Sequence, residues 1–185
     1  MAERAARMFR LDNEVLAFRF TATLSDRAGA APLERLTSPE RLRLWLDAVE
    51  LSPGRPVTAG ERESALTLRE AIYRLGSALA RRADPPPADV LTLNAAAAGG
   101  LPQATLTPTG RRWLLDRDEP VAAALAVIAH DAIAVLGTDS ATRIKTCDGP
   151  ECAGLFLDTS RGINRRWCSM NTCGNRAKKA RMHHA

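Results

Sequence analysis

The stretch RRWCSMNTCGNRAKKARM (165–182) decides the fold of the end of this chain, because it combines two cysteines with a basic run that contains no acidic residue. Four residues separate Cys168 from Cys173, and four also separate Cys147 from Cys152. Fifteen residues lie between the two pairs, and the chain has no other cysteine. Structural zinc sites take four thiolate or imidazole ligands in a tetrahedron, commonly as two short-spaced pairs joined by a longer loop. The spacing therefore predicts one structural zinc ion bound by Cys147, Cys152, Cys168 and Cys173.

Other cysteine chemistry fits this spacing less well. The common ferredoxin patterns of iron–sulfur clusters have different intervals, and thiol redox pairs use two intervening residues rather than four. A catalytic zinc site would keep an open coordination position and a nearby acid or base. Asp148, Glu151 and Asp158 are close in sequence, but we expect them on the solvated surface.

Positive charge is concentrated at the end of the chain. Residues 1–140 contain 17 basic and 18 acidic residues, whereas residues 141–185 contain 9 basic and 3 acidic ones. The net charge is therefore −1 before residue 140 and +6 after it, or about +4 once four thiolates and one zinc ion are included. This asymmetry favours a polyanionic partner, and it predicts two domains, 1–140 and 141–185, with the first able to fold without the second.

The basic residues of the second domain are candidates for nucleic-acid contacts, chiefly with phosphates, although such runs are often only a solvated face. The candidates are Arg161, Arg165, Arg166, Arg176, Lys178, Lys179 and Arg181. Two readings of Arg176 stay open: it contacts nucleic acid, or it is a buried brace onto an acid such as Asp158. For Phe156 and Trp167 we favour a small core over base stacking.

The first domain is predicted to be mainly α with a small antiparallel β-sheet, an α+β fold. Residues 15–24 (VLAFRFTATL) are rich in aromatic residues and Thr and predict a strand. Residues 104–115 predict a hairpin that turns near Thr109-Gly110. Start and stop residues together with apolar periodicity predict four helices, which begin at Pro39, after Thr58, after the Pro85–Pro87 run and at Pro120. The last of these is apolar almost all round, so we expect it to be central.

The segment FLDTSRGINRRWCSMNTCGNRAKKAR (156–181) resembles the CGNR zinc finger, whose name stands here as Cys173-Gly174-Asn175-Arg176. Residues 15–137 resemble, more loosely, the ABATE domain that usually precedes this finger in a family of stress-induced transcription regulators. The resemblance implies zinc bound by four cysteines, DNA binding, and a zinc-stabilised module of the treble-clef or knuckle type that ends in a basic helix. Two departures stand out: 18–23 lacks the acid and the Asn of the family motif, and 153–155 lacks an expected Trp.

We therefore expect a bacterial transcription regulator that binds nucleic acid, DNA in the first instance, and is not an enzyme. The excess of Arg over Lys, 23 to 3, is typical of GC-rich bacterial coding. No leader or membrane span is visible, so we expect a cytoplasmic protein. An RNA-binding module and a protein-interaction module are the alternatives. The sequence leaves open a homodimer and names no small-molecule effector.

Overall fold

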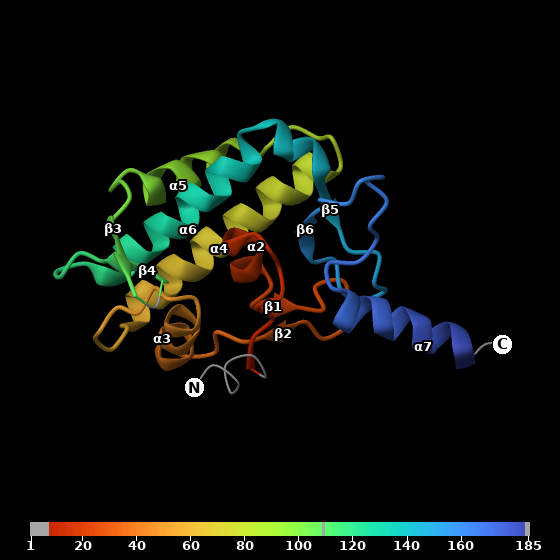
Figure 1. Cartoon of the computed structure of the whole chain (residues 1–185), viewed down its shortest axis with the longest axis horizontal. Helices are drawn as coiled ribbons and strands as arrows, with labels where there is room; N and C mark the ends of the chain where they lie inside the picture. Colours follow the sequence, from red (N-terminus) through yellow and green to blue (C-terminus); the bar gives the residue numbers. More distant parts are fainter. Residues whose placement is uncertain (1–7, 109, 184–185) are drawn as a thin grey trace.

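The computed structural model describes residues 8–108 and 110–183, apart from the side chains of residues 180, 181 and 183. It is mainly helical with small antiparallel sheets, which confirms the predicted fold class (Figure 1). Its α-helices are α2 Leu16–Thr21, α3 Pro39–Ala48, α4 Ala59–Ala80, α5 Pro87–Ala97, α6 Pro120–Leu136 and α7 Asn175–His183. Its strand pairs are β1 Leu24–Ser25 with β2 Leu33–Glu34, β3 Gln103–Thr107 with β4 Gly110–Leu114, and β5 Ile144–Thr146 with β6 Leu155–Leu157.

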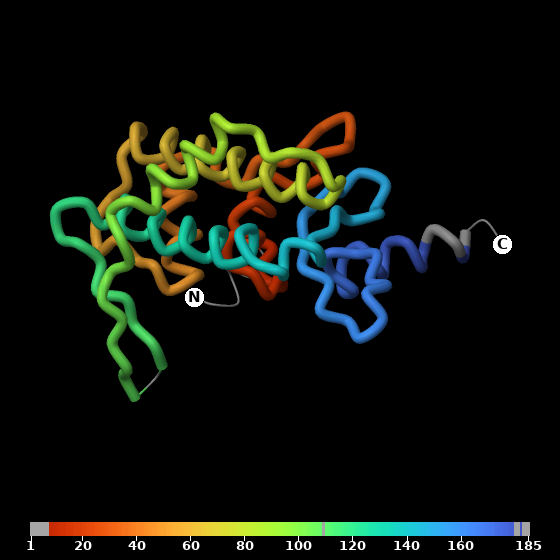
Figure 2. Tube along the Cα trace, turned by 90° about the horizontal axis from the view of Figure 1, so that it is seen from above, coloured from red at the N-terminus to blue at the C-terminus, as the bar shows by residue number. Residues whose placement is uncertain are grey.

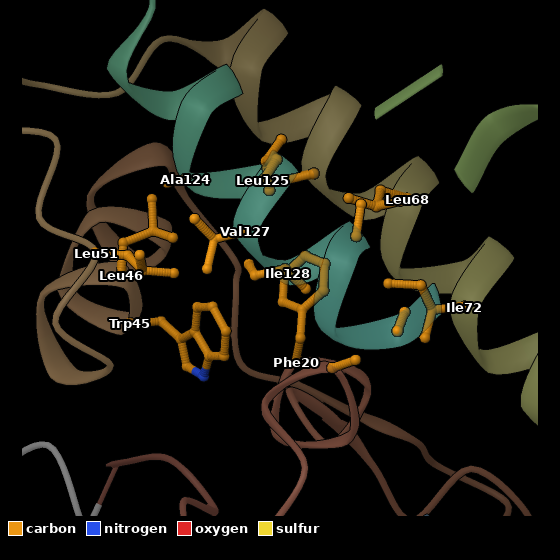
Figure 3. Close-up of a cluster of buried hydrophobic side chains, with 14 of the residues drawn as sticks. Phe20, Trp45, Leu46, Leu51, Leu68, Ile72, Ala124, Leu125, Val127 and Ile128 are labelled. Atoms are coloured by element: carbon orange, nitrogen blue, oxygen red, sulfur yellow. The ribbon is translucent and has the colours of Figure 1, made fainter. Parts of the chain in front are cut away.

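Helix α6 lies at the centre of the helical part, as its apolar sequence predicts. Helices α2, α4 and α5 all pack against it. In the core, Val127 and Ile128 of α6 lie beside Trp45 of α3 and Phe20 of α2 (Figure 3). The Phe20 and Trp45 rings are 5.0 Å apart between centroids, and both side chains are fully buried. These aromatic side chains bring α2 and α3 onto the central helix.

The predicted helix starts at Pro39 and after Thr58 are confirmed. The Ser38 side chain accepts a hydrogen bond from the Arg41 N–H, and Pro39 occupies the first helical position. Thr58 and Glu61 form a complete capping box at the start of α4. Local side-chain chemistry therefore sets where both helices begin.

The predicted strand over residues 15–24 is wrong, because residues 16–21 form helix α2 and only Leu24–Ser25 is extended. The amide of Ala17 donates to the Asp131 carboxylate of α6 at 2.8 Å, and the amide of Val15 donates to the Asn13 side chain. These contacts satisfy N–H groups at the start of α2 that have no partner within the helix. Tertiary contacts thus override the strand preference of the aromatic and Thr residues.

The predicted hairpin is confirmed as β3 and β4, with Gln103 opposite Leu114 and Thr107 opposite Gly110. Thr109, at the predicted turn, lies outside the described residues. The hairpin projects from the helical body (Figure 2), and Leu106 is 87% exposed.

The C-terminal segment packs on the helical part through β5 and β6, which lie against α4. Ile144 and Leu155 are buried in the same core as the helices, whereas Phe156 is buried among the cysteines. Because neighbouring residues of a strand face opposite sides, β6 contributes Leu155 to one core and Phe156 to another. The domain boundary near residue 140 stays a prediction, but apolar packing continues across it.

Candidate metal centre

The first cysteine pair is positioned by β5 and by a tight turn. Cys147 directly follows β5 and its amide donates to the Gly154 carbonyl, while the Cys152 amide donates to the Gly149 carbonyl. A β-carbon on Gly149 would lie 3.1 Å from the Cys152 Cβ, and one on Gly154 would lie 3.3 Å from the Cys152 Sγ. These contacts are tighter than ordinary van der Waals packing, so both glycines make room for the cysteines.

The second cysteine pair is positioned at the start of the basic helix. Cys173 lies in a π-helical turn, Met170–Gly174, that leads directly into α7. Ser169 caps this turn by accepting from the Thr172 amide, and the Asn175 side chain donates to the Asn171 carbonyl. These hydrogen bonds fix the first residues of α7 relative to the cysteines.

The four sulfurs have the geometry of a tetrahedral zinc site. All four lie within 4.8 Å of one another, and all four cysteines are buried. Cys168 Sγ is 3.6 Å from Cys152 Sγ and 3.8 Å from Cys173 Sγ. A tetrahedron with Zn–S bonds of about 2.3 Å has sulfur–sulfur edges of about 3.8 Å. Cys147, Cys152, Cys168 and Cys173 therefore form a site suited to one zinc ion.

The electrostatics of the cluster call for a cation. Hydrogen bonds with the sulfurs of Cys147, Cys152 and Cys173, together with burial, raise the pKa of the Cys168 thiol. Four thiolates this close repel one another, so they are stable together only when a positive ion lies among them. Zinc supplies that charge and binds the deprotonated sulfurs.

A small core supports the cluster. Phe156 is buried, and Trp167 packs half-buried against it, as the sequence predicted. Arg165 donates to the carbonyls of Trp167 and Cys168, and its guanidinium lies 5.1 Å from the Phe156 ring centroid. The Arg165 side chain thus braces the loop that carries Cys168.

Asp158 is the buried polar centre of the segment, and the expectation that it is solvated is wrong. Its side chain is 0% exposed, and its carboxylate accepts from the Lys145 ammonium at 2.7 Å, from Ser160 and from the Arg165 amide. Burial alone would raise the pKa of Asp158, but these hydrogen bonds hold it below its usual value. Asp158 was also the suggested partner of Arg176, and that pairing is not formed.

Arg176 is instead exposed and faces the helical part of the molecule. Its guanidinium lies 3.5 Å from the Asp26 carboxylate, and 53% of its side chain is exposed. A buried brace is therefore not its role. An exposed ion pair at this distance contributes little to stability, which leaves Arg176 able to exchange Asp26 for another anion.

The other predicted contact residues differ in their exposure and in their ion pairs. Arg161, Lys178 and Lys179 are exposed, and none forms an ion pair with another described residue. Arg166 is 65% exposed and pairs with Asp148, while its guanidinium lies 5.4 Å from the Trp167 ring. The side chain of Arg181 lies outside the described part of the chain.

Sequence reasoning missed the residues of the helical part that contact the metal segment. Arg10 donates to three of the cysteine sulfurs. The Tyr73 hydroxyl donates to the Ala153 carbonyl at 3.0 Å, and the Arg27 amide donates to the Cys152 carbonyl. Because these residues lie about 80 or more positions from their partners, no local pattern in the sequence indicates them.

Two family models match the chain. The ABATE model, described as "Putative stress-induced transcription regulator", matches residues 14–139, and the CGNR zinc finger model matches residues 143–185. The ABATE match includes residues 18–23. No curated protein matches the chain significantly. Within the described residues, no helix is long and apolar enough to cross a membrane.

Proposed function

We propose that this chain, which belongs to the ABATE family and ends in a CGNR zinc finger, regulates transcription by binding DNA through that finger. The supporting observation is that the metal site leads directly into a basic helix with exposed lysines. Cys173 lies in the turn that starts α7, and Lys178 and Lys179 follow on α7 with exposed side chains. Bound zinc would thereby fix the start of the helix that carries these two cations.

The charge and exposure of this surface suit contacts with phosphates. Figure 1 shows α7 extending away from the helical body, so its cations are accessible to a large partner. Lys178 and Lys179 have no intramolecular ion pair among the described residues that a phosphate would have to displace. Arg161 and Arg166, in the loop before Cys168, add exposed positive charge to the same finger.

One finger is a small footprint for a specific DNA site, because specific complexes usually use dimers or several modules. We therefore place sequence selection in a second copy of the chain or a second DNA-contacting surface, and assign to α7 the phosphate contacts. We place the activity in the bacterial cytoplasm, where reducing conditions keep thiols available for zinc.

A double variant tests this assignment. Replacing Lys178 and Lys179 by Ala should weaken binding to all duplex sequences alike. Since each phosphate contact contributes about −0.9 to the slope of log K against log salt, the slope should flatten by up to about two. The matched control replaces Arg112 of β4 and Arg117, which lies between β4 and α6, by Ala; both are exposed. Figure 1 shows β4 and α7 on opposite sides of the molecule.

The control should change the salt slope much less, although it removes the same net charge. Equal effects of the two double variants would mean that only net charge matters and would contradict a role for α7. Binding to RNA but not to DNA duplexes would favour the RNA-binding alternative over DNA binding. A protein-interaction role would follow if the zinc-loaded chain bound neither.

A further inference from the structure

The zinc site receives a charged contact from the opposite end of the chain. Arg10 lies before α2, and its Nη2 is 3.2 Å from Cys168 Sγ and 3.6 Å from Cys173 Sγ. Its Nη1 is 3.7 Å from Cys152 Sγ. Cys147 accepts instead from the backbone amides of Gly149 and Cys168. Each of the four sulfurs thus receives an N–H donor, and one guanidinium supplies donors for three of them.

Contacts on both sides of Arg10 hold it at the cluster. Phe9 is buried in the helical core, and the Met8 carbonyl accepts from Arg35 at 2.9 Å. The Asn13 side chain donates to the Leu155 carbonyl of β6 at 2.9 Å. Arg10, Cys152 and Cys168 line a pocket of about 20 Å³ together with Asn13 and Leu155, which leaves room for about one water molecule. Cys152 and Cys168 are 2% and 7% exposed, so Arg10 contacts sulfurs that are largely removed from bulk solvent.

The charge of the site explains why a guanidinium is useful there. One zinc ion and four thiolates carry a net charge of −2, and a buried charge is costly unless it is paired and hydrogen-bonded. Arg stays protonated and presents several N–H donors in one plane, so it can contact three sulfurs together. Groups that hydrogen-bond to metal ligands in this way typically change metal affinity by 10- to 100-fold.

We propose that Arg10 is an outer-shell residue of the zinc centre, so that the zinc affinity of the finger depends on the domain that precedes it. The metal site then belongs to both parts of the chain. Loss of zinc removes the negative cluster that holds Arg10, and displacement of the N-terminal segment weakens the site. This inference rests on the contacts between Arg10 and the cysteine sulfurs and is independent of nucleic-acid binding.

The test uses the full chain with Arg10→Met, Arg10→Lys and the control Arg35→Met. Arg35 anchors the same segment through the Met8 carbonyl and the Ser25 hydroxyl, but forms no contact with sulfur among the described residues. Zinc affinity is measured by competition with a chromogenic chelator. We expect Arg10→Met to lower it about 10- to 100-fold, Arg10→Lys to restore part of the loss, and Arg35→Met, which keeps the Arg10 guanidinium, to lower it much less than Arg10→Met.

Cobalt(II) substitution gives a readout that loosened packing alone would not change. Hydrogen bonds from the guanidinium stabilise the sulfur lone pairs, so their loss should shift the thiolate-to-cobalt charge-transfer band to lower energy. The shift should appear in Arg10→Met, be smaller in Arg10→Lys and be absent in Arg35→Met. Unchanged affinity and spectrum in Arg10→Met, or equal effects in Arg35→Met, would overturn the proposal. If Arg10→Met does not fold, zinc affinity and the cobalt spectrum are compared between Arg10→Lys and Arg35→Lys. Equal effects of these two variants would overturn the proposal.

Discussion

Leu155 of β6 lies so close to Gly76 of α4 that a β-carbon on residue 76 would come within 2.6 Å of the Leu155 Cδ1 atom. Leu155 is 2% exposed and belongs to the core of the helices. Strand β6, which follows the first cysteine pair, therefore packs directly against α4 at a position where the helix has no side chain. This close approach connects the metal segment to the rest of the molecule.

Gly76→Val should destabilise the chain by about 1–3 kcal/mol, because added methyl groups overpack a filled contact. The matched control is Gly60→Val in the same helix, where a β-carbon would meet nothing within 4 Å. Urea unfolding of both zinc-loaded variants gives the comparison. Equal losses at the two positions would show that helix propensity, and not the contact with Leu155, sets the cost.

A chain ending at Asp139 should fold, as the predicted boundary implies, but with lower stability. It lacks Ile144 and Leu155, which are 3% and 2% exposed. Burial of each such side chain contributes about 1.5–3 kcal/mol, so we expect a total loss of roughly 3–6 kcal/mol by urea unfolding. An unchanged free energy of unfolding would mean that the two parts are energetically independent.

Asp158→Asn should destabilise the finger by about 1.5–3 kcal/mol, the usual contribution of hydrogen bonds to a charged group. The change keeps the shape of the side chain but removes the charge that pairs with Lys145. Asp148→Asn is the control, because its pair with Arg166 is exposed and should contribute at most about 1 kcal/mol. Thermal unfolding with excess zinc measures both, and similar melting temperatures for the two variants would refute the central role of Asp158.

Arg176→Ala should leave the melting temperature of the zinc-loaded chain nearly unchanged but weaken duplex DNA binding. Its only described ion pair, with Asp26, is long and exposed. Asp26→Asn removes the same pair while keeping the cation, so its DNA binding should hold or increase. A drop in melting temperature with Arg176→Ala, without loss of affinity, would instead assign Arg176 a structural role.

The features that the sequence predicted correctly depend on neighbours in the chain. The cysteine intervals specify the zinc ligands because each pair is bridged by a short turn. Ser38 and Thr58 cap their helices through amides three residues away. In such cases the chemistry that sets the structure lies within one short window of sequence.

The features that were missed depend on contacts between distant segments. Helix α2 is capped in part by Asp131, more than a hundred residues later, so its local composition was misleading. The burial of Asp158 was missed for a less distant reason: the Lys145 ammonium that compensates it comes from strand β5, thirteen residues earlier, and only the pairing of β5 with β6 brings the two together. Arg10 reaches the sulfurs only after the two ends of the chain have come together.

Zinc-dependent binding to duplex DNA tests the central claim most directly. A labelled duplex is titrated with the full chain in its zinc-loaded, chelator-stripped and zinc-restored states, at two salt concentrations. We predict micromolar or tighter binding by the loaded chain that weakens with salt, is lost on stripping and returns with zinc. A loaded and folded chain that fails to bind at micromolar concentration, or that binds equally well without zinc, would contradict the account.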